Sequence, residues 1–505
     1  MSKALQTSQA VAVIGSGTMG CGIALVAGTA GHRVLLLDAV PEAIQRGLER
    51  LRADLSRLVS RGKITAEARD ARLALIEPAP NLDSLAPAAL IVEAIVEDLD
   101  IKGALLSRVE ALVAPDAILA TNTSSLSITA LAARLRRPER VVGMHFFNPA
   151  QVLPLVEIVS GHLTDTAVAE MVEATAAAWG KTTVRCRSTP GFIVNRVARP
   201  FYGEALRLLM ENAADVATLD AVLRDCGGFR MGPFELMDLI GNDVNYAVTK
   251  SVYDAMSQDP RYKPSLVQRE LVDAGLFGRK SGRGFYDYRD TASRPPAIDA
   301  PSGPKPAHVV IEGDLGIATP LAGLAEAAGL AVERRDGAGV VRVDGTTLAL
   351  SDGRTATQRT HDTGEPTMLF DLALDYTSAS RIAIAGPDQH DLAPVAKAAG
   401  FFQAIGKAVS VLDDAPGLAV MRTVAMLANE AADALHQQIA TTAGIDLAMR
   451  MGVNYPVGPL AWADAVGPAH CLRTIDHLAA VYGEDRYRAS PLLRRMALSQ
   501  RQFHS

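Results

Sequence analysis

The feature that most constrains the fold is an internal repeat with one constant spacing. Pro190-Gly191 recurs as Pro416-Gly417, 226 positions later, and Gly232-Pro233 recurs as Gly458-Pro459 at the same distance. Three further matches keep this register: Trp179-Gly180-Lys181 with Ile405-Gly406-Lys407, Asp238 with Asp464, and Gly241 with Gly467. Turn motifs that recur by accident would not hold one register over about 60 residues, so the chain contains two related halves.

A second register links the starts of the two halves. Gly15, Gly31 and Asp38 match Gly313, Gly329 and Asp336, each at a spacing of 298 positions. Because the two spacings differ by 72 residues, we infer that the second half has lost about that length from its first domain. A chain of 505 residues also exceeds one ordinary hydrophobic core, so several domains are expected.

The residue pattern changes along the first half. Between residues 10 and 140, short apolar runs alternate with longer helical patterns, which indicates a parallel sheet with crossover helices. The clearest runs are Val11–Ile14, Val34–Leu37, Leu90–Val92 and Ala117–Leu119. From about residue 188 to 280 the pattern is helical, and residues 291–306 are rich in Pro, Ala and Ser, which predicts a linker.

Composition excludes several functional classes. The net charge is −6, without the clustered basic face that nucleic-acid binding requires. Apolar stretches are interrupted before membrane-spanning length, and the N-terminus lacks the pattern of a secretory signal. The cysteines are too scattered for a zinc site or a disulfide framework, standing at Cys21, Cys186, Cys226 and Cys471. We therefore expect a cytoplasmic, enzyme-sized protein without a metal, a membrane partner or a nucleic-acid partner.

A nucleotide-binding signature follows the first apolar run. In Gly15-Ser16-Gly17-Thr18-Met19-Gly20, Gly15 permits a tight turn, Gly17 lets the backbone approach a diphosphate, and Gly20 allows close packing of helix on strand. Asp38 ends the next run, where a carboxylate accepts hydrogen bonds from ribose and repels a 2′-phosphate, so NAD is favoured over NADP. The matching loop of the second half has Asp314 and Leu315 in place of two of these residues, and we predict that it binds no NAD.

Candidate catalytic residues follow in two further apolar runs. Residues 122–126 come after a predicted strand, where open parallel sheets place ligands. His145 and Glu157 each stand inside an apolar run, and on neighbouring strands they would form a base oriented by a carboxylate. A lone histidine in such a run is more often a hydrogen-bonded core residue, but a buried unpaired carboxylate is costly, which favours the pair.

These stretches together resemble the L-3-hydroxyacyl-CoA dehydrogenase family over residues 10–288. The matching motifs are residues 92–97, Asn122 to Leu126, 145–149, 190–196, Gly232-Pro233 and 282–286. The layout with a decayed second half is similar to longer bacterial members of phenylacetate degradation that act on 3-hydroxyadipyl-CoA, and it also fits 3-hydroxybutyryl-CoA dehydrogenases. The resemblance implies NAD-dependent oxidation of (S)-3-hydroxyacyl-CoA to 3-oxoacyl-CoA, as in β-oxidation of fatty acids.

The resemblance also implies a role for each matching residue. His145 is expected to be the general base and Glu157 its supporting carboxylate, while Ser124 and Asn195 contact the substrate. Four residues are expected along the cofactor, with Asn148 also framing the site: Glu97, Lys102, Asn122 and Asn148. Candidates for the CoA phosphates are not ranked by the sequence and comprise Lys250, Lys263, Lys280, Arg283 and the basic segment 50–63.

The predicted fold class is α/β, with a shortened duplicate behind a complete first half. We expect a Rossmann-type NAD-binding domain at 8–187, an all-α dehydrogenase domain at 188–290, the linker at 291–306, a shortened degenerate Rossmann-like domain at 307–413 and a second helical domain at 414–505. Met421 stands at the register of Asn195, the motif of residues 145–149 has no copy between 307 and 410, and no second Gly-Phe-Tyr ending follows Arg495.

The second half is therefore expected to be structural. It would act as an internal partner for the first helical domain, and a further homodimer stays open. Two other functions stay open as well: a dehydrogenase of a free sugar or hydroxy acid on the same scaffold, and a non-catalytic NAD-binding protein. The sequence does not give the acyl chain of the substrate.

Overall fold

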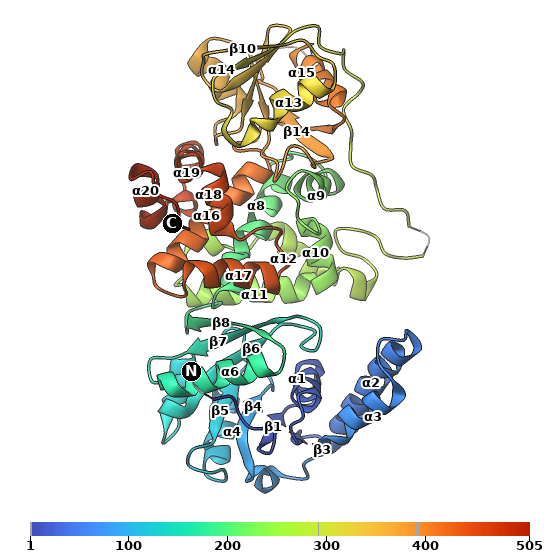
Figure 1. Ribbon diagram of the computed structural model, residues 1–505, viewed down its shortest axis with the longest axis vertical. Coiled ribbons are helices and arrows are strands. Elements are labelled where there is room, and N and C mark those ends of the chain that lie inside the picture. The colour runs from blue at the N-terminus through green and yellow to red at the C-terminus, as the bar shows by residue number, and fades with distance from the viewer. Residues whose placement is uncertain (1–2, 291, 390–392, 505) are drawn as a thin grey trace. The chain divides into compact units, whose positions relative to one another are not determined.

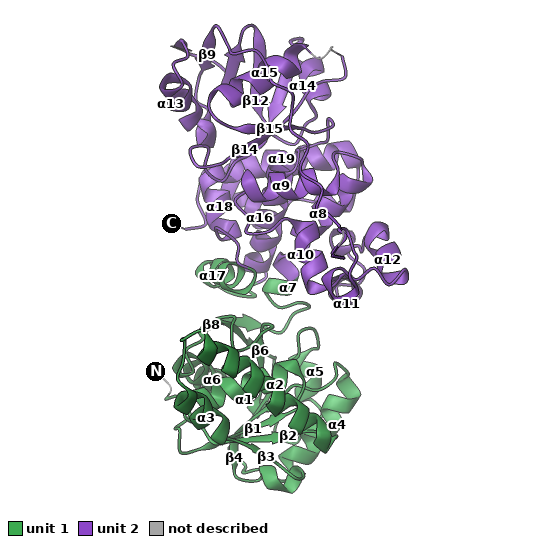
Figure 2. Ribbon diagram, turned by 90° about the vertical axis from the view of Figure 1, so that its right-hand side faces the viewer, with its two compact units in different colours: residues 1–195, 438–453 green, residues 196–437, 454–505 purple. Residues whose placement is uncertain are grey.

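The computed structural model describes residues 3–290, 292–389 and 393–504. The chain divides into two compact units (Figure 2). Unit 1 comprises Met1–Asn195 and Gln438–Val453, and unit 2 comprises Arg196–Gln437 and Asn454–Ser505. Each unit thus draws on residues from both sequence halves.

The core of unit 1 is an eight-stranded sheet in the order β3-β2-β1-β4-β5-β6-β7-β8 (Figure 1). Its strands are β1 (Ala10–Ile14), β2 (Val34–Leu37), β3 (Ile76–Pro78), β4 (Ala88–Glu93), β5 (Ile118–Thr121), β6 (Val141–Phe146), β7 (Leu155–Ser160) and β8 (Thr182–Arg187). Neighbouring strands are parallel except for β6 and β7. The interior strands β1 and β2 are buried along their whole length, as aliphatic strands covered on both faces should be.

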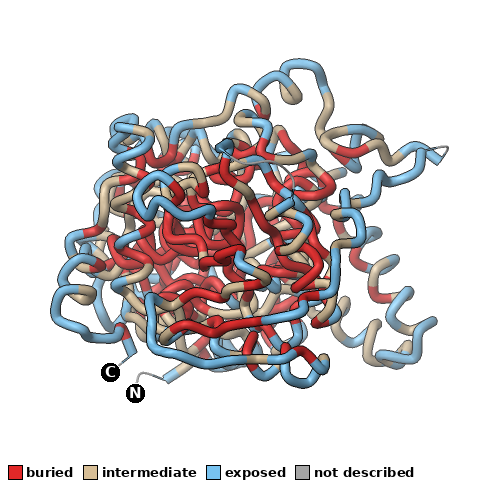
Figure 3. The backbone as a smooth tube through the Cα atoms, turned by 90° about the horizontal axis from the view of Figure 1, so that it is seen from above, coloured by how far each residue is buried: buried red, intermediate tan, exposed pale blue. Residues whose placement is uncertain are grey.

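Helices connect these strands. They are α1 (Thr18–Thr29), α2 (Pro41–Ser60), α3 (Ala66–Ala74), α4 (Leu99–Glu110), α5 (Ile128–Ala132) and α6 (Thr166–Ala178). The small residues of α1 let it bury most of its length against the sheet, whereas the long helix α2 buries one narrow stripe, formed by Ile44, Gly47, Leu51 and Leu55. Figure 3 shows the corresponding contrast between buried stretches in the interior and exposed stretches at the periphery.

One helix of unit 1 comes from the second half of the sequence. This helix, α17 (Thr442–Gly452), packs on β7 and β8, and the amide of Arg187 donates to the carbonyl oxygen of Ile439 at 2.9 Å. A Cβ on Gly452 would lie 2.8 Å from the side chain of Leu155, so a larger residue there would require that side chain to shift. At the spacing of 226 residues α17 corresponds to α9 (Val216–Asp225), which packs on β14 (Arg381–Ala385) in unit 2.

Unit 2 contains the helices of both halves. The first set is α8 (Arg199–Met210), α9, α10 (Pro233–Ile240), α11 (Asn242–Ala255) and α12 (Leu266–Asp273), preceded by the short α7 (Val194–Val197) at the boundary with unit 1. The second set is α16 (Val420–His436), α18 (Pro459–Val466), α19 (Pro468–Tyr482) and α20 (Pro491–Leu498). Helices α8 and α16 pack against each other, so the two related sets share one core.

Unit 2 also contains a seven-stranded mixed sheet in the order β10-β9-β11-β12-β13-β14-β15. Its other strands are β9 (Val309–Glu312), β10 (Val332–Arg335), β11 (Val340–Val343), β12 (Thr346–Leu350), β13 (Thr367–Phe370) and β15 (Ala408–Val411), with helices α13 (Pro320–Ala327), α14 (Ala356–Thr363) and α15 (Ala393–Ala404). Within the described part of this sheet domain, α2, α3, β3 and α4 of unit 1 have no counterpart. The predicted loss of residues therefore removed peripheral elements and kept seven strands.

Residues 292–306 form neither helix nor strand, and part of this segment pairs with the edge of the second sheet. The amide of Ala300 donates to the carbonyl oxygen of Val409 in β15 at 2.7 Å, and Ser410 donates to the carbonyl oxygen of Ile298 at 3.1 Å. The segment thus covers an edge strand that would otherwise expose unpaired backbone groups.

The two helical sets end in equivalent ways although their sequences differ. Asp238 accepts hydrogen bonds from the amides of Phe285 and Tyr286, and Asp464 accepts them from the amides of Phe503 and His504. The second Gly-Phe-Tyr motif is missing from the sequence, but its backbone hydrogen bonds are made by other residues. Across the described chain, no helix is long and apolar enough to cross a membrane.

Candidate active site

The glycine-rich loop joins β1 to α1 in unit 1. Gly15 has φ +104°, and a Cβ there would lie 2.5 Å from the carbonyl oxygen of Ala94. A Cβ on Gly20 would lie 1.8 Å from the carbonyl oxygen of Gly15, whereas a Cβ on Gly17 would meet no atom within 4 Å. Gly17 is also the N-cap of α1 and receives no side-chain cap. The start of α1 therefore presents its amide groups to open space, which fits a diphosphate.

Asp38 lies beside this loop. Its Oδ2 accepts hydrogen bonds from the amide and the hydroxyl of Ser16, both at 2.7 Å. Burial alone would raise the pKa of Asp38, but the donors on Ser16 and the amide of Val40 hold it below its ordinary value. Asp38 borders a hollow of about 710 Å³ whose other lining residues are Ser16, Gly17, Ala43, Arg46, Glu49, Arg50 and Ala53. An ionised carboxylate there fits the ribose hydroxyls of NAD.

Lys102 lies between two glutamates next to the loop that follows β5: Glu93, which is buried, and Glu97, which is exposed. The ammonium of Lys102, 1% exposed, donates to Glu93 at 2.6 Å and lies 3.2 Å from Glu97. Burial alone would raise the pKa of Glu97, but Lys102 and donors from Thr123 and Ser124 hold it below its ordinary value. Lys102 is thus committed to two carboxylates and orients the loop through Glu97, and Glu93 is a member that the sequence prediction missed.

His145 and Glu157 are direct cross-strand partners on β6 and β7. The Nδ1 atom of His145 lies 2.7 Å from Oε2 of Glu157, and both side chains are buried. The other carboxylate oxygen of Glu157 accepts hydrogen bonds from the amides of Ile193 and Val194, each at 3.0 Å. With Nδ1 held by the carboxylate, Nε2 of His145 is the nitrogen available to exchange a proton.

Aromatic side chains fix the imidazole further. The ring centroids of Phe147 and Phe192 lie 4.6 Å and 5.6 Å from that of His145. Phe192 has φ +50°, next to Gly191 at φ +74°, so a strained turn holds this ring in place. The carboxylate and the two rings therefore restrict the orientation of a buried base.

The remaining predicted residues differ in their exposure. Asn122 is half-buried, and its Oδ1 accepts a hydrogen bond from the amide of Phe146 at 2.8 Å, which ties the loop after β5 to β6. Ser124 and Asn195 are half-buried and Asn148 is exposed. Among the described residues, no hydrogen bond joins Ser124, Asn148 or Asn195 to His145. The polar groups of these three side chains are therefore not engaged in hydrogen bonds with His145.

The second half carries no equivalent pair. Asp371 stands at the register of His145 and Ala383 at that of Glu157. The carboxylate of Asp371 accepts hydrogen bonds from the amides of Ala419, Val420 and Met421. Ala419 and Val420 stand at the register of Ile193 and Val194, whose amides donate to Glu157 in unit 1. In the second half, the carboxylate that accepts these amide hydrogen bonds thus stands at the register of the neighbouring strand, and the histidine base is absent. The spacing of 226 residues places Asp371 and Ala383 at the positions of His145 and Glu157 in the sequence itself, but the sequence prediction did not include this comparison.

The loop after β9 also lacks features of the cofactor-binding loop in the first half. Asp314 accepts a hydrogen bond from the amide of Gly316 at 2.8 Å, and the side chain of Leu315 is buried. The carboxylate therefore occupies an amide that a phosphate would need. We retain the proposal that NAD binds only in the first half.

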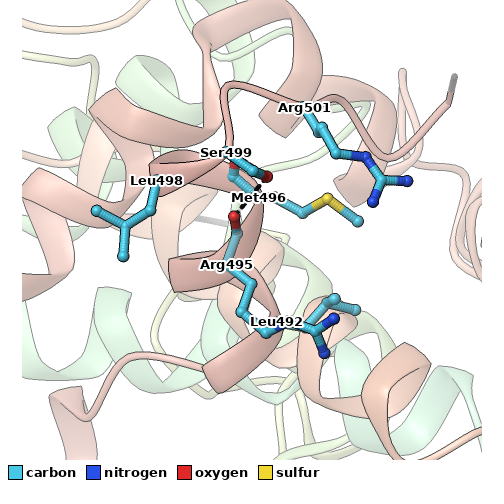
Figure 4. Close-up of a pocket in the computed structure, with 6 residues that line it drawn as sticks. All are labelled: Leu492, Arg495, Met496, Leu498, Ser499 and Arg501. Atoms are coloured by element: carbon cyan, nitrogen blue, oxygen red, sulfur yellow. Dashed lines mark hydrogen bonds between the residues drawn. The ribbon is translucent and has the colours of Figure 1, made fainter.

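A further hollow, of about 350 Å³, lies at the end of α20 and contains none of the predicted site residues (Figure 4). Its side chains are Leu492, Arg495, Met496, Leu498, Ser499 and Arg501. The hydroxyl of Ser499 donates to the backbone carbonyl oxygens of Arg495 and Met496, which closes the helix end. These side chains include no histidine, carboxylate or cysteine, so the hollow lacks the groups that general-base or metal chemistry requires.

The open start of α1, the ionised Asp38 and the imidazole–carboxylate pair define a dinucleotide-dependent oxidoreductase of alcohols. Models of the NAD-binding and C-terminal domains of 3-hydroxyacyl-CoA dehydrogenase match residues 10–189 and residues 191–288 and 417–502. A model of the reduced Rossmann-fold domain of 3-hydroxybutyryl-CoA dehydrogenase matches residues 348–416. The chain belongs to the 3-hydroxyacyl-CoA dehydrogenase family, which confirms the predicted family, fold class, enzyme class and NAD dependence.

Relatives of two lengths match this chain. The 3-hydroxyadipyl-CoA dehydrogenase of Escherichia coli K12 is 44% identical over 98% of this chain and 99% of its own. A probable 3-hydroxybutyryl-CoA dehydrogenase of Deinococcus radiodurans is 40% identical over 55% of this chain and 99% of its own. The crystal structure of a 3-hydroxybutyryl-CoA dehydrogenase from Escherichia coli K12 matches with a TM-score of 0.89 at 44% identity, covering 98% of this chain and 99% of that one. The duplicated layout is thus shared with longer relatives, while shorter ones match about half of the chain.

Proposed function

We propose that the preferred substrate of this dehydrogenase is (S)-3-hydroxyadipyl-CoA, which is oxidised to the 3-oxoacyl thioester. The observation that carries the catalytic part of the proposal is the 2.7 Å contact between His145 and Glu157. Nε2 of His145 accepts the proton of the 3-hydroxyl group, and the carboxylate of Glu157 stabilises the imidazolium that forms. NAD, when bound at the start of α1, supplies the hydride acceptor.

The other predicted residues take supporting roles in this proposal. Ser124 and Asn195 contact the reacting oxygen and the thioester, and Asn122 and Asn148 face the cofactor. Glu97 also lies along the cofactor and holds Ser124 through an amide hydrogen bond of 2.8 Å. Lys102 is a positioning residue because its ammonium is buried between Glu93 and Glu97.

The choice of acyl chain rests on the long relative. The Escherichia coli protein that aligns over almost the full length of both chains carries the name 3-hydroxyadipyl-CoA dehydrogenase. The alternative, 3-hydroxybutyryl-CoA, is favoured by the name of the equally similar crystal structure and of the shorter relatives. The two acyl groups differ in length and in the distal carboxylate.

A substrate panel separates these functions. We expect the highest kcat/KM on 3-hydroxyadipyl-CoA, a lower value on 3-hydroxybutyryl-CoA, and negligible turnover of free 3-hydroxyadipate or of a sugar acid such as gulonate. An equal preference for the free acid and the thioester would refute the assignment. Higher kcat/KM on the butyryl thioester would assign the alternative acyl chain instead.

The second half acts, in this proposal, as an internal partner. Helix α16 packs on α8 as the helix of a second subunit would. The sheet domain of the second half has Asp371 in place of the histidine base. A homodimer of the whole chain is an additional proposal that sedimentation at several concentrations tests. We also propose a cytoplasmic location, with which the four free, buried cysteines agree.

A further inference from the structure

Unit 2 contains a cavity of about 710 Å³ that is lined by none of the residues predicted to be catalytic or cofactor-binding, although Lys263, one of the candidates for the CoA phosphates, is part of its lining. Helices α8, α11 and α12 and the two short turns at residues 260–262 and 485–487 form its walls. Apolar groups cover much of the lining, contributed by Leu206, Met210, Tyr253, Pro264 and Leu266. The cavity is thus large enough for a chain of several carbon atoms, with walls that favour one.

Three of the four arginines that line this cavity are neutralised by carboxylates. Arg207 donates to Glu211 and Glu484, Arg261 pairs with Glu430, and Arg486 donates to Glu204. These arginines therefore belong to the ion-pair network of the helical core. Their charges are already compensated.

Arg199, the fourth, differs from the others. It is 6% exposed, and no carboxylate of the described residues lies within ion-pair distance of its guanidinium. Nη1 donates to the hydroxyl of Thr249 at 2.9 Å, the guanidinium lies 4.9 Å from the ring centroid of Tyr202, and Nε has no hydrogen-bond partner. A neutral hydroxyl and an aromatic face orient the group without compensating its charge.

A buried cation without a counter-charge is costly, so proteins rarely retain one unless an anion completes the site. Burial lowers the pKa of Arg199, but an arginine side chain stays protonated at ordinary pH. Its planar fork matches a carboxylate in a bidentate geometry. The second half does not keep the feature, because Ala425 stands at the register of Arg199.

We infer that this cavity binds a carboxylate carried on an aliphatic chain, with Arg199 as its counter-charge. Two sources offer such a group: a free aliphatic acid, and the distal carboxylate of a dicarboxylic acyl-CoA. The second source rests on the proposed function, whereas the first does not. The shared chemistry is one carboxylate on an apolar chain of several carbons.

The first test is binding of adipate to the full-length protein, with hexane-1,6-diol as the uncharged probe of equal length. Calorimetric titration should show adipate binding to the native protein, and Arg199→Met should weaken it at least about tenfold, as loss of a charge-assisted hydrogen bond predicts. Arg495→Met, which removes an exposed arginine from α20, is the matched control and should leave binding unchanged. Near-ultraviolet circular dichroism checks folding, and Arg199→Lys, which keeps the charge, serves if Arg199→Met does not fold.

The second test uses 3-hydroxyadipyl-CoA and 3-hydroxyhexanoyl-CoA, which differ only in the distal carboxylate. If the acyl chain supplies the carboxylate, Arg199→Met lowers kcat/KM on the adipyl thioester at least about tenfold and leaves the hexanoyl value unchanged. If a free acid supplies it, adipate binding falls and the ratio of the two kcat/KM values stays constant. If native protein does not oxidise 3-hydroxyadipyl-CoA but still binds adipate through Arg199, the proposed substrate fails and the site stands. An Arg199→Met protein that is unchanged in both tests overturns the inference.

Discussion

Glu204 and Glu430 occupy equivalent positions in α8 and α16, 226 residues apart, and each is held by arginines in the same pattern. Glu204 accepts from Arg422 and Arg486, and Glu430 accepts from Arg196 and Arg261. All these side chains are buried. The duplication thus built a two-fold related ion-pair network inside one chain, of the kind that a symmetric dimer would place at its interface.

Removing Glu204 should destabilise unit 2 strongly. Burial alone would raise its pKa, but Arg486 and Arg422 lower it to about 2. Glu204→Gln removes a buried charge from two arginines, so we expect a loss of about 3–5 kcal/mol in the free energy of unfolding. Urea denaturation at pH 7 measures it, and Glu326→Gln, at an exposed carboxylate in α13, is the control.

The interaction of Glu204 with its two arginines also predicts that the stability of the protein depends on pH. Because the pKa of Glu204 is about 2 in the folded protein and near 4.3 in an unfolded chain, its contribution is complete above about pH 5. It falls as the pH drops toward 2. The difference in unfolding free energy between the native protein and Glu204→Gln should therefore shrink over this interval, and a constant difference would contradict the assignment.

Cofactor binding should depend on the glycine-rich loop of the first half, which contains Gly17, and not on the matching loop of the second half. Gly17→Val fills the open space at the start of α1, so we expect NAD binding to disappear from a stoichiometry of one per chain. Gly323→Val places the same side chain in open space on α13 and should leave binding intact. Residual stoichiometric binding in Gly17→Val, measured by calorimetry, would show that the second half holds a cofactor.

The preference for NAD over NADP should depend on Asp38. Its carboxylate shares a hollow with Arg46 and Arg50, so Asp38→Ala leaves a positive environment for a 2′-phosphate. We expect the ratio of kcat/KM for NADP to that for NAD to rise at least about tenfold. Glu49→Gln, which removes another carboxylate charge from the same hollow, serves as a comparison. An unchanged ratio in Asp38→Ala would assign the preference to another group.

Glu157→Gln tests the carboxylate separately from the base. The variant keeps an acceptor for the amides of Ile193 and Val194 but loses the charge that stabilises an imidazolium, so kcat should fall about 100-fold. Asp371→Asn, at the register of His145 in the second half, should leave kcat per folded molecule unchanged. Equal losses in the two variants would indicate a structural effect and not a catalytic one.

The sequence predicts those parts of the fold that depend on local pattern and register. The glycine loop, the sheet around β1 and the proximity of His145 to Glu157 follow from apolar runs and from the order of strands. Helix α17 is different, because the exchange that places residues 442–452 on β8 depends on tertiary packing that periodicity does not report. The linker's pairing with β15 escapes prediction for the same reason.

Within the site, single motifs suggested which residues gather but not how their charges are shared. Lys102 was predicted along the cofactor, yet its neutralisation by Glu93 depends on strand β4 facing the start of α4. Arg199 carries no motif at all, and its missing counter-charge becomes visible only once every carboxylate near it is placed. Such pairings arise between elements far apart in the chain.

We propose that His145 in the first half performs the proton transfer for the whole chain. The most direct measurement compares kcat/KM on the 3-hydroxyacyl-CoA substrate and the Kd of NAD for His145→Gln and the native protein. We expect kcat/KM to fall by about 10³-fold or more while the Kd of NAD stays unchanged. Full activity in His145→Gln would contradict the account.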